Sequence, residues 1–247
     1  MQNKKVSFIF LIIVLITLFG CSTQKSEKLP RNVNSKQAQI FSQILRNNLS
    51  RETTKFQVTA LSTKGANFAS EGYVNWKNGL VSNSVSLNGS GRADLNAISN
   101  KDLVYENYFG LDTLMKKNNL TPKKWVSRTI DKSIYGIDSI SQFILSLVST
   151  TAENPLLLKQ DGAQYLGQRK INGDVTSMFR KKGGDIVYYT KNDSTLLGVR
   201  VTLKGFTTPM LITFSSSANI TIEVPNENDV YSIDDVSKFY FQNRPKF

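Results

Sequence analysis

Two Asn-Gly dipeptides, Asn78-Gly79 and Asn172-Gly173, each stand between runs of alternating apolar and polar residues. This dipeptide favours the two-residue type I′ turn, which reverses the chain into an antiparallel hairpin. Before the first turn, Phe68 and Val74 fall on one face of a predicted strand, and residues 80–87 form its partner. The chain is therefore predicted to build an antiparallel sheet from hairpins.

Further alternating runs extend this pattern over most of the chain. Strands are predicted at residues 56–60, 68–76, 80–87, 92–98, 103–108, 164–170, 175–180, 186–190, 196–203, 210–214 and 220–224, with a short one at 125–126. The strands do not alternate with helices as βαβ units, which argues against a parallel sheet. We expect an α+β fold with a large antiparallel sheet of about ten strands.

Other segments carry apolar residues at helical spacing. Residues 36–49 predict an amphipathic helix with Ser35 as its N-cap, packed on the sheet or, alternatively, facing lipid. Residues 137–148 predict a second helix, and Pro155 suits the first position of a short third one. Asp112–Asn119 fits a helical turn or a loop. A curved sheet covered by these helices would enclose an apolar interior, either a filled core or a cavity.

The tail, residues 230–247, is apolar enough to dock as a last helix or strand. Its paired acids, Asp234-Asp235, are adjacent, so they would not face one site. No other carboxylate pair stands out in the sequence.

The chain begins with two lysines, an apolar run of residues 6–19, Gly20 and then Cys21, the one cysteine of the sequence. This order is typical of a secretory signal, and the run is shorter than the roughly 20 residues of a spanning helix. Leu18-Phe19-Gly20-Cys21 resembles the bacterial lipobox, which implies an acylated Cys21 anchored to the membrane on its extracytoplasmic face. The alternative is a cysteine inside an uncleaved anchor.

These features divide the chain into a signal (1–20), an acylated tether (21–36) and one folded domain (37–247). The domain is long enough to bury a sizeable core, and we expect it to be monomeric.

Composition removes several classes of chemistry. The chain has no histidine and one cysteine, which excludes Ser-His-Asp and Cys-His catalysis, an intramolecular disulfide and the usual zinc sites. Ser22 and Lys25 have SxxK spacing but lie in the tether, and Gly89-Ser90-Gly91 fails the dinucleotide-binding pattern. We expect a protein that is not an enzyme and has no cofactor or metal.

The formal net charge is +12, from 31 basic and 19 acidic residues. Outside the cytoplasm, anionic headgroups or wall polymers are nearer partners than nucleic acid, so no nucleic-acid ligand is expected. The alternative is a generic solvated surface, because the lysines are scattered.

The order of elements resembles the actinobacterial lipoproteins typified by LppX, LprA, LprF and LprG. The matching pieces run from the acylated Cys21 and the first helix through the strand meander to Trp125, Asn154-Pro155-Leu156-Leu157-Leu158, Leu166-Gly167, Lys170–Gly173, Val199–Leu203, Phe206, Pro209–Phe214 and Val224-Pro225. The resemblance implies a half-barrel like that of LolA and LolB, with helices closing its open side. It also implies a cavity for the acyl chains of a lipid or glycolipid. The basic, Asn-rich composition departs from Ala/Gly-rich members of the family.

By position, the resemblance assigns seven apolar residues to the cavity wall. They are Val74, Trp76, Leu87, Ile140, Phe143, Ile144 and Leu147. The alternative, that each of them belongs to a plain core, is the simpler interpretation. The leading hypothesis is thus a membrane-anchored lipoprotein that carries or displays a lipid. The alternatives are an envelope interaction or sensor module with a filled core and, third, a hydrolase with a carboxylate pair in a cleft.

Overall fold

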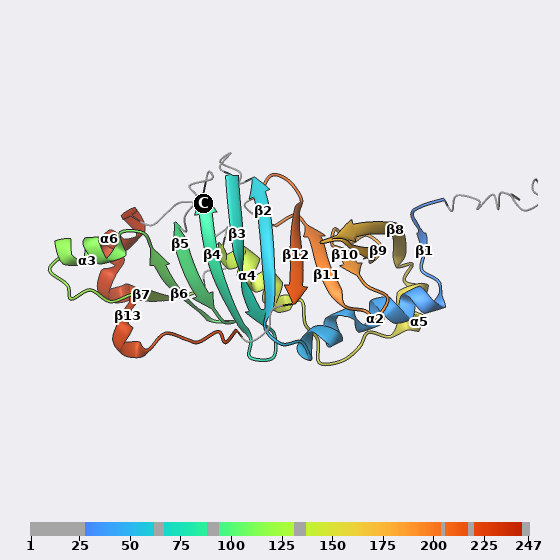
Figure 1. Cartoon of the computed structure of the whole chain (residues 1–247), viewed down its shortest axis with the longest axis horizontal. Helices are drawn as coiled ribbons and strands as arrows, with labels where there is room; N and C mark the ends of the chain where they lie inside the picture. The colour runs from blue at the N-terminus through green and yellow to red at the C-terminus, as the bar shows by residue number, and fades with distance from the viewer. Residues whose placement is uncertain are drawn as a thin grey trace, which may run out of the picture.

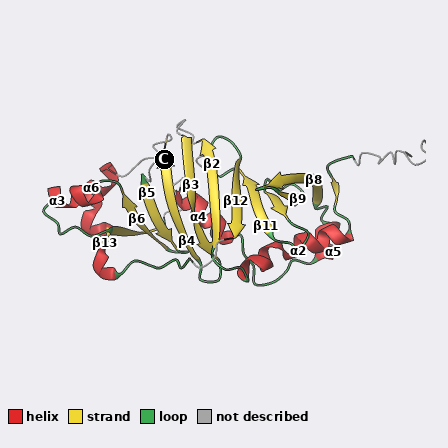
Figure 2. Cartoon of the chain, viewed as in Figure 1, coloured by secondary structure: helices red, strands yellow, loops and turns green. Residues whose placement is uncertain are grey.

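The computed structural model describes residues 28–61, 67–87, 94–130, 137–203, 206–216 and 220–243. Over these ranges the chain forms one α+β fold with a 13-stranded sheet and five α-helices (Figures 1 and 2). Cys21, the predicted signal and the first part of the predicted tether lie outside the described residues.

The element bounds follow the chain. The strands are β1 (Arg31–Asn32), β2 (Thr54–Leu61), β3 (Asn67–Asn75), β4 (Leu80–Leu87), β5 (Leu95–Ser99), β6 (Leu103–Tyr108), β7 (Trp125–Thr129), β8 (Gln164–Ile171), β9 (Asp174–Arg180), β10 (Val187–Thr190), β11 (Leu196–Val201), β12 (Met210–Ser216) and β13 (Val230–Ser232). The helices are α2 (Ser35–Leu49), α3 (Leu111–Lys117), α4 (Ile137–Ser146), α5 (Pro155–Gln160) and α6 (Ile233–Asn243), with a 3₁₀ turn at Glu227–Asp229.

The sheet is open, with strand order β1-β8-β9-β10-β11-β12-β2-β3-β4-β5-β6-β7-β13. Neighbouring strands are antiparallel throughout the described sheet except β7 and β13, which run parallel. The two halves of the chain join where β12 pairs with β2 and Phe214 lies opposite Phe56. The predicted antiparallel sheet in mostly hairpin order is confirmed.

The strand number and the last strand differ from the prediction. The sheet has 13 strands instead of about ten, partly because β1 and β13 are too short to show an alternating pattern. Residues 220–224, predicted as a strand, form none, and Ile220 and Val224 are exposed. β12 already has β11 and β2 on its two sides, so no free edge lies beside it.

The two Asn-Gly turns also differ from each other. At the β8–β9 hairpin, Asn172 and Gly173 both have positive φ, as a type I′ turn requires. Between β3 and β4 the loop is four residues long, and within it Gly79 alone has positive φ. There the Asn75 side chain accepts a hydrogen bond from the main-chain amide of Asn78 at 2.9 Å. This contact between a side chain and the main chain stabilises the longer loop.

Helix α2 begins one residue earlier than predicted. Asn34, not Ser35, is the N-cap: its side chain accepts from the amide of Gln37, whose side chain accepts from the amide of Asn34. The buried face of the helix includes Phe41, which stacks on Phe179 of β9 with ring centroids 5.3 Å apart. The predicted packing of this helix on the sheet is therefore confirmed.

The main core lies between the sheet and the helices. Figure 1 shows α4 behind β3 and β4, α2 with α5 beside β8–β11, and α3 with α6 at the opposite end. A second, smaller apolar cluster contains Ile171, Val187, Tyr189 and Leu197. Because side chains alternate along a strand, Tyr188 points into the main core while Val187 and Tyr189 join this second cluster.

Candidate functional site

Of the seven residues predicted to line a cavity, five belong to the main core and two pack against it. Ile140, Phe143 and Ile144 lie on α4, and Leu147 follows it. Val74, Trp76, Ile140, Ile144 and Leu147 are at most 3% exposed, while Leu87 and Phe143 are partly buried. The two pockets described below, at Arg51 and at Ser84, are lined by other side chains.

Trp76 connects the sheet to α4. Its Nε1 donates a hydrogen bond to the main-chain oxygen of Ile144 at 2.8 Å, and its ring lies 5.6 Å from that of Phe214. On the outer side, the guanidinium of Arg51 lies 5.4 Å from the centre of the indole. Burial lowers the pKa of Arg51 to about 10, and the carboxylate of Asp193 opposes this shift.

A second contact lies one turn earlier on the helix. The side-chain amide of Asn83, on β4, donates to the hydroxyl of Ser141 at 2.6 Å, and Ser70 of β3 donates to Asn83 at 3.4 Å. All three side chains are buried. Since a buried polar group without a partner is unfavourable, these contacts hold α4 in one position over the sheet.

The third contact is a buried ionic cluster that links α4, α6 and the sheet. Both terminal nitrogens of Arg128 (β7) bind Asp138, at 2.7 and 2.8 Å, and one also binds Glu106 of β6 at 2.5 Å. The hydroxyl of Tyr240, on α6, donates to Glu106 at 2.6 Å. Burial by itself lowers the pKa of Arg128, but the hydrogen bonds to Asp138 and Glu106 raise it above its ordinary value.

These three contacts lie on one face of the helix. Asp138, Ser141 and Ile144 follow one another at intervals of three residues, and residues three apart on a helix are neighbours. Glu106 and Asp138 bind the same arginine, but they are 32 residues apart in the sequence. The prediction that no carboxylate pair stands out in the sequence therefore missed them. A signal existed for two members of the cluster: Glu106 follows Val104 by two residues and Arg128 follows Val126 by two, and side chains two apart on a strand share a face.

A polar hollow of about 620 Å³ opens beside Trp76, at the loop between β3 and β4. It is lined by Ser50, Arg51, Glu52, Thr53, Asn75, Lys77, Asn78, Ile220 and Thr221. Arg51 belongs to this hollow and also covers the indole of Trp76, so it lies between the solvent and the core beneath α4. The hollow can accept an anionic or hydroxylated group.

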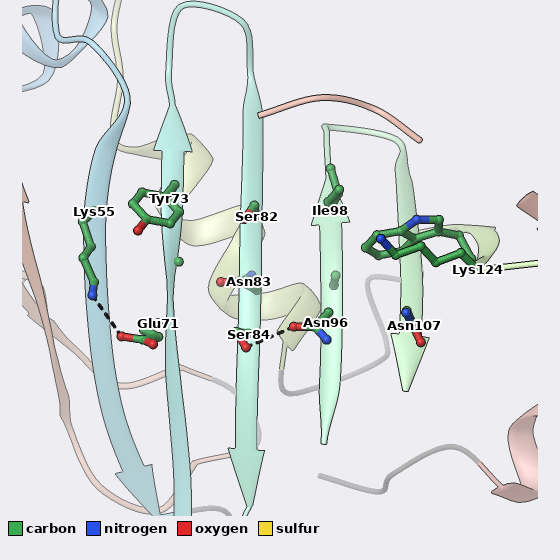
Figure 3. A pocket seen from close by; sticks show the side chains of 13 residues that line it. Lys55, Glu71, Tyr73, Ser82, Asn83, Ser84, Asn96, Ile98, Asn107 and Lys124 are labelled. Carbon is green, nitrogen blue, oxygen red and sulfur yellow. Dashed lines mark hydrogen bonds and ion pairs between the residues drawn. The ribbon is translucent and has the colours of Figure 1, made fainter. Parts of the chain in front are cut away.

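The outer face of β2–β7 carries a smaller pocket of about 310 Å³ (Figure 3). Small polar side chains form its floor, and Ser84 donates to Asn96 at 3.0 Å. One rim holds an ion pair of Lys55 and Glu71 at 3.1 Å, and the hydrogen bond from Lys55 lowers the pKa of Glu71. At the other rim the Lys124 ammonium lies 5.7 Å from the centre of the Trp125 ring. This pocket can form hydrogen bonds to a polar molecule.

In the part of the chain that the structure describes, no group of three or more His, Cys, Asp or Glu residues could hold a metal ion. No helix there is long and apolar enough to cross a bilayer.

No protein-family model matches this chain, and no curated protein matches it either. Among solved structures, it is similar to an uncharacterized conserved protein from Thermus thermophilus, with 12% identity over 78% of this chain and 97% of that one, at a TM-score of 0.41. It is also similar to a LolA superfamily protein from Nitrosomonas europaea, with 7% identity over 74% and 92% of the two chains, at a TM-score of 0.28. Both TM-scores are below 0.5, so neither similarity assigns a family or a function.

Proposed function

We propose that this protein is a monomeric, membrane-anchored extracytoplasmic lipoprotein, acylated at Cys21, with a binding rather than an enzymatic role. Its domain would bind the acyl chains of a lipid or glycolipid between the sheet and α4, for transport or display. The headgroup would occupy the polar hollow at Arg51 and Lys77.

One observation carries the proposal: α4, a single helix of ten residues, packs on a broad apolar sheet face next to a cationic hollow. Beneath and beside it, every strand from β2 to β7 contributes buried apolar side chains to the inner face. Its buried side chains include Phe56, Val58, Phe68, Val74, Val81, Val85, Leu95, Ala97, Val104 and Val126. A lateral movement of α4 would open a surface able to take an acyl chain.

The driving force would be desolvation. Burial of apolar surface contributes about 25 cal/mol per Å², or about 0.8 kcal/mol for each methylene group. An acyl chain could thus replace the apolar contacts that α4 gives up. Arg51 would then lie at the boundary, with its cation toward an anionic headgroup and its plane on Trp76.

The test uses the chain from Ser22 to Phe247, which keeps every described element and lacks Cys21. Native mass spectrometry after gentle purification, or after incubation with phosphatidylglycerol, should show a discrete added mass that organic extraction removes. A chain that stays unliganded under both conditions would overturn the proposal.

A disulfide lock tests the route of entry. Asn83→Cys with Ser141→Cys places two thiols across the contact between β4 and α4, and the removal of Cys21 leaves no other cysteine. Once mass spectrometry confirms the disulfide, the locked chain should take up no phosphatidylglycerol, and a reductant should restore uptake. The two single-cysteine variants are the controls. Equal uptake by the locked and reduced chains would contradict entry beneath α4.

A second candidate, an envelope interaction module with a filled core, is favoured by the three polar contacts along α4 and by the burial of Trp76 and Ile144. In that case the interior is a permanent core and binding occurs on the surface. A chain that stays lipid-free in both the locked and the reduced forms would support it.

A further inference from the structure

Three leucines are exposed at one end of the molecule. Leu156 and Leu157 on α5 are 66% and 53% exposed, and Leu29, just before β1, is 45% exposed. The next residue of α5, Leu158, is 5% exposed and belongs to the core, so it fixes which side of the helix faces outward. Leucines this exposed at one end of the molecule indicate a contact surface.

The N-terminal chain leads to this same end. β1 pairs with β8, the Val33 amide donates to the carbonyl of Ala163, and the Lys159 ammonium donates to the hydroxyl of Ser35. Figure 1 shows β1 and α5 together at the right-hand end. Lys28, the first described residue, follows Cys21 by seven residues, a reach of at most about 25 Å.

The charge of this end is positive. Segments 28–36, 153–163 and 180–185 meet here: Lys181 pairs with Glu153 at 2.8 Å, and Gly162 lies against the side chain of Lys182. The charged residues of these segments are the basic Lys28, Arg31, Lys36, Lys159, Arg180, Lys181 and Lys182 and the acidic Glu153, Asp161 and Asp185. The excess of basic side chains complements an anionic surface.

We propose that this end docks on the anionic surface of the membrane beside the anchor, with Leu156 and Leu157 inserted among the headgroups. The proposal rests on the proposed function, because it takes Cys21 as the anchor. A short tether alone brings the domain near the bilayer but leaves its orientation free. Apolar insertion combined with basic side chains would fix one orientation, as for other peripheral membrane contacts.

The test measures sedimentation of the Ser22–Phe247 chain with vesicles. The vesicles are made of phosphatidylcholine alone or of phosphatidylcholine with phosphatidylglycerol. The chain should bind the anionic vesicles and lose affinity as salt rises. Leu156→Ser with Leu157→Ser should weaken binding about tenfold or more, because two apolar side chains no longer insert. Lys159→Gln with Lys182→Gln should weaken binding to anionic vesicles and reduce its salt dependence.

The matched control is Phe109→Ser, since Phe109 is 67% exposed at the opposite end of the molecule, beside α3. It should leave vesicle binding unchanged, and all variants should keep the melting temperature of the parent chain. The proposal fails if no vesicle is bound, if the double leucine variant binds like the parent, or if only Phe109→Ser weakens binding. If the chain binds lipid in its interior but does not bind vesicles, the docking proposal fails while the proposed function stands.

Discussion

Arg128 and Asp138 form a two-point ion pair inside the protein, with nitrogen–oxygen distances of 2.7 and 2.8 Å and both side chains at most 4% exposed. The pair connects β7 with the first turn of α4. Glu106 shares the guanidinium and also accepts from Tyr240, so one arginine joins the sheet to two helices. The position of α4 therefore depends on buried electrostatics as well as on apolar contact.

Asp138→Ala tests this dependence. The variant leaves Arg128 buried with Glu106 but without the carboxylate of Asp138. This loss should lower the free energy of unfolding by about 3 kcal/mol. Urea unfolding followed by circular dichroism measures the change. Asp112→Ala, on the exposed first turn of α3, is the control and should cost less than about 1 kcal/mol. Equal effects of the two variants would show that the pair contributes nothing specific.

Tyr108→Phe should stabilise the protein. The Tyr108 hydroxyl is buried and finds no hydrogen-bond partner among the described residues, so its removal should raise the free energy of unfolding by about 1 kcal/mol. Tyr105→Phe, on the same strand but half-buried, should change little. A destabilised Tyr108→Phe variant would mean that the hydroxyl has a partner in solution.

The same substitution should change the alkaline behaviour. Burial, and secondarily the charge of Glu106, raises the pKa of Tyr108 to about 12, against 10.0 in the unfolded chain. Between these values the unfolded chain releases the proton first, so stability is complete below pH 10 and falls as pH rises toward 12. Urea midpoints across this window should fall less steeply for Tyr108→Phe. Part of the stability that the variant still loses would come from Tyr188, because burial raises the pKa of that side chain to about 12 as well.

Gly72→Ala should be severely destabilising. A Cβ on Gly72 would lie 1.8 Å from the main-chain oxygen of Ser82 and 2.9 Å from the ring of Phe56, and the strand cannot move away from its partner. We expect a loss of about 3 kcal/mol or more, or failure to fold. Gly184→Ala, with its nearest contact at 3.4 Å, is the matched control. Comparable melting temperatures for both variants would contradict the close packing of β3 and β4.

The two tryptophans should respond differently to replacement by phenylalanine. Trp76→Phe removes the hydrogen bond to Ile144 and part of the core packing, which should lower the free energy of unfolding by about 2 kcal/mol. Trp125→Phe, on the outer face and half-buried, should cost less than about 1 kcal/mol. If Trp125→Phe proves the more damaging, Trp76 does not hold α4 on the sheet.

Local sequence patterns predicted most of the elements because they depend on neighbouring residues. Alternation identified the strands from β2 to β12, and helical spacing identified α2 and α4. The Asn172-Gly173 prediction was correct: both residues have the positive φ that a two-residue type I′ turn requires. The turn at Asn78-Gly79 came out longer because the Asn75 side chain supplies an acceptor inside the loop.

The sequence alone thus determined an antiparallel α+β fold, the inward-facing residues and the absence of histidine chemistry. Only the tertiary structure decided what those inward residues do. Glu106, Arg128 and Asp138 come from three elements and meet because β6 pairs with β7 and the first turn of α4 contacts Arg128. Contacts between distant segments depend on the arrangement of the whole chain, and for that reason no local pattern predicted the ionic cluster or the leucines exposed beside β1.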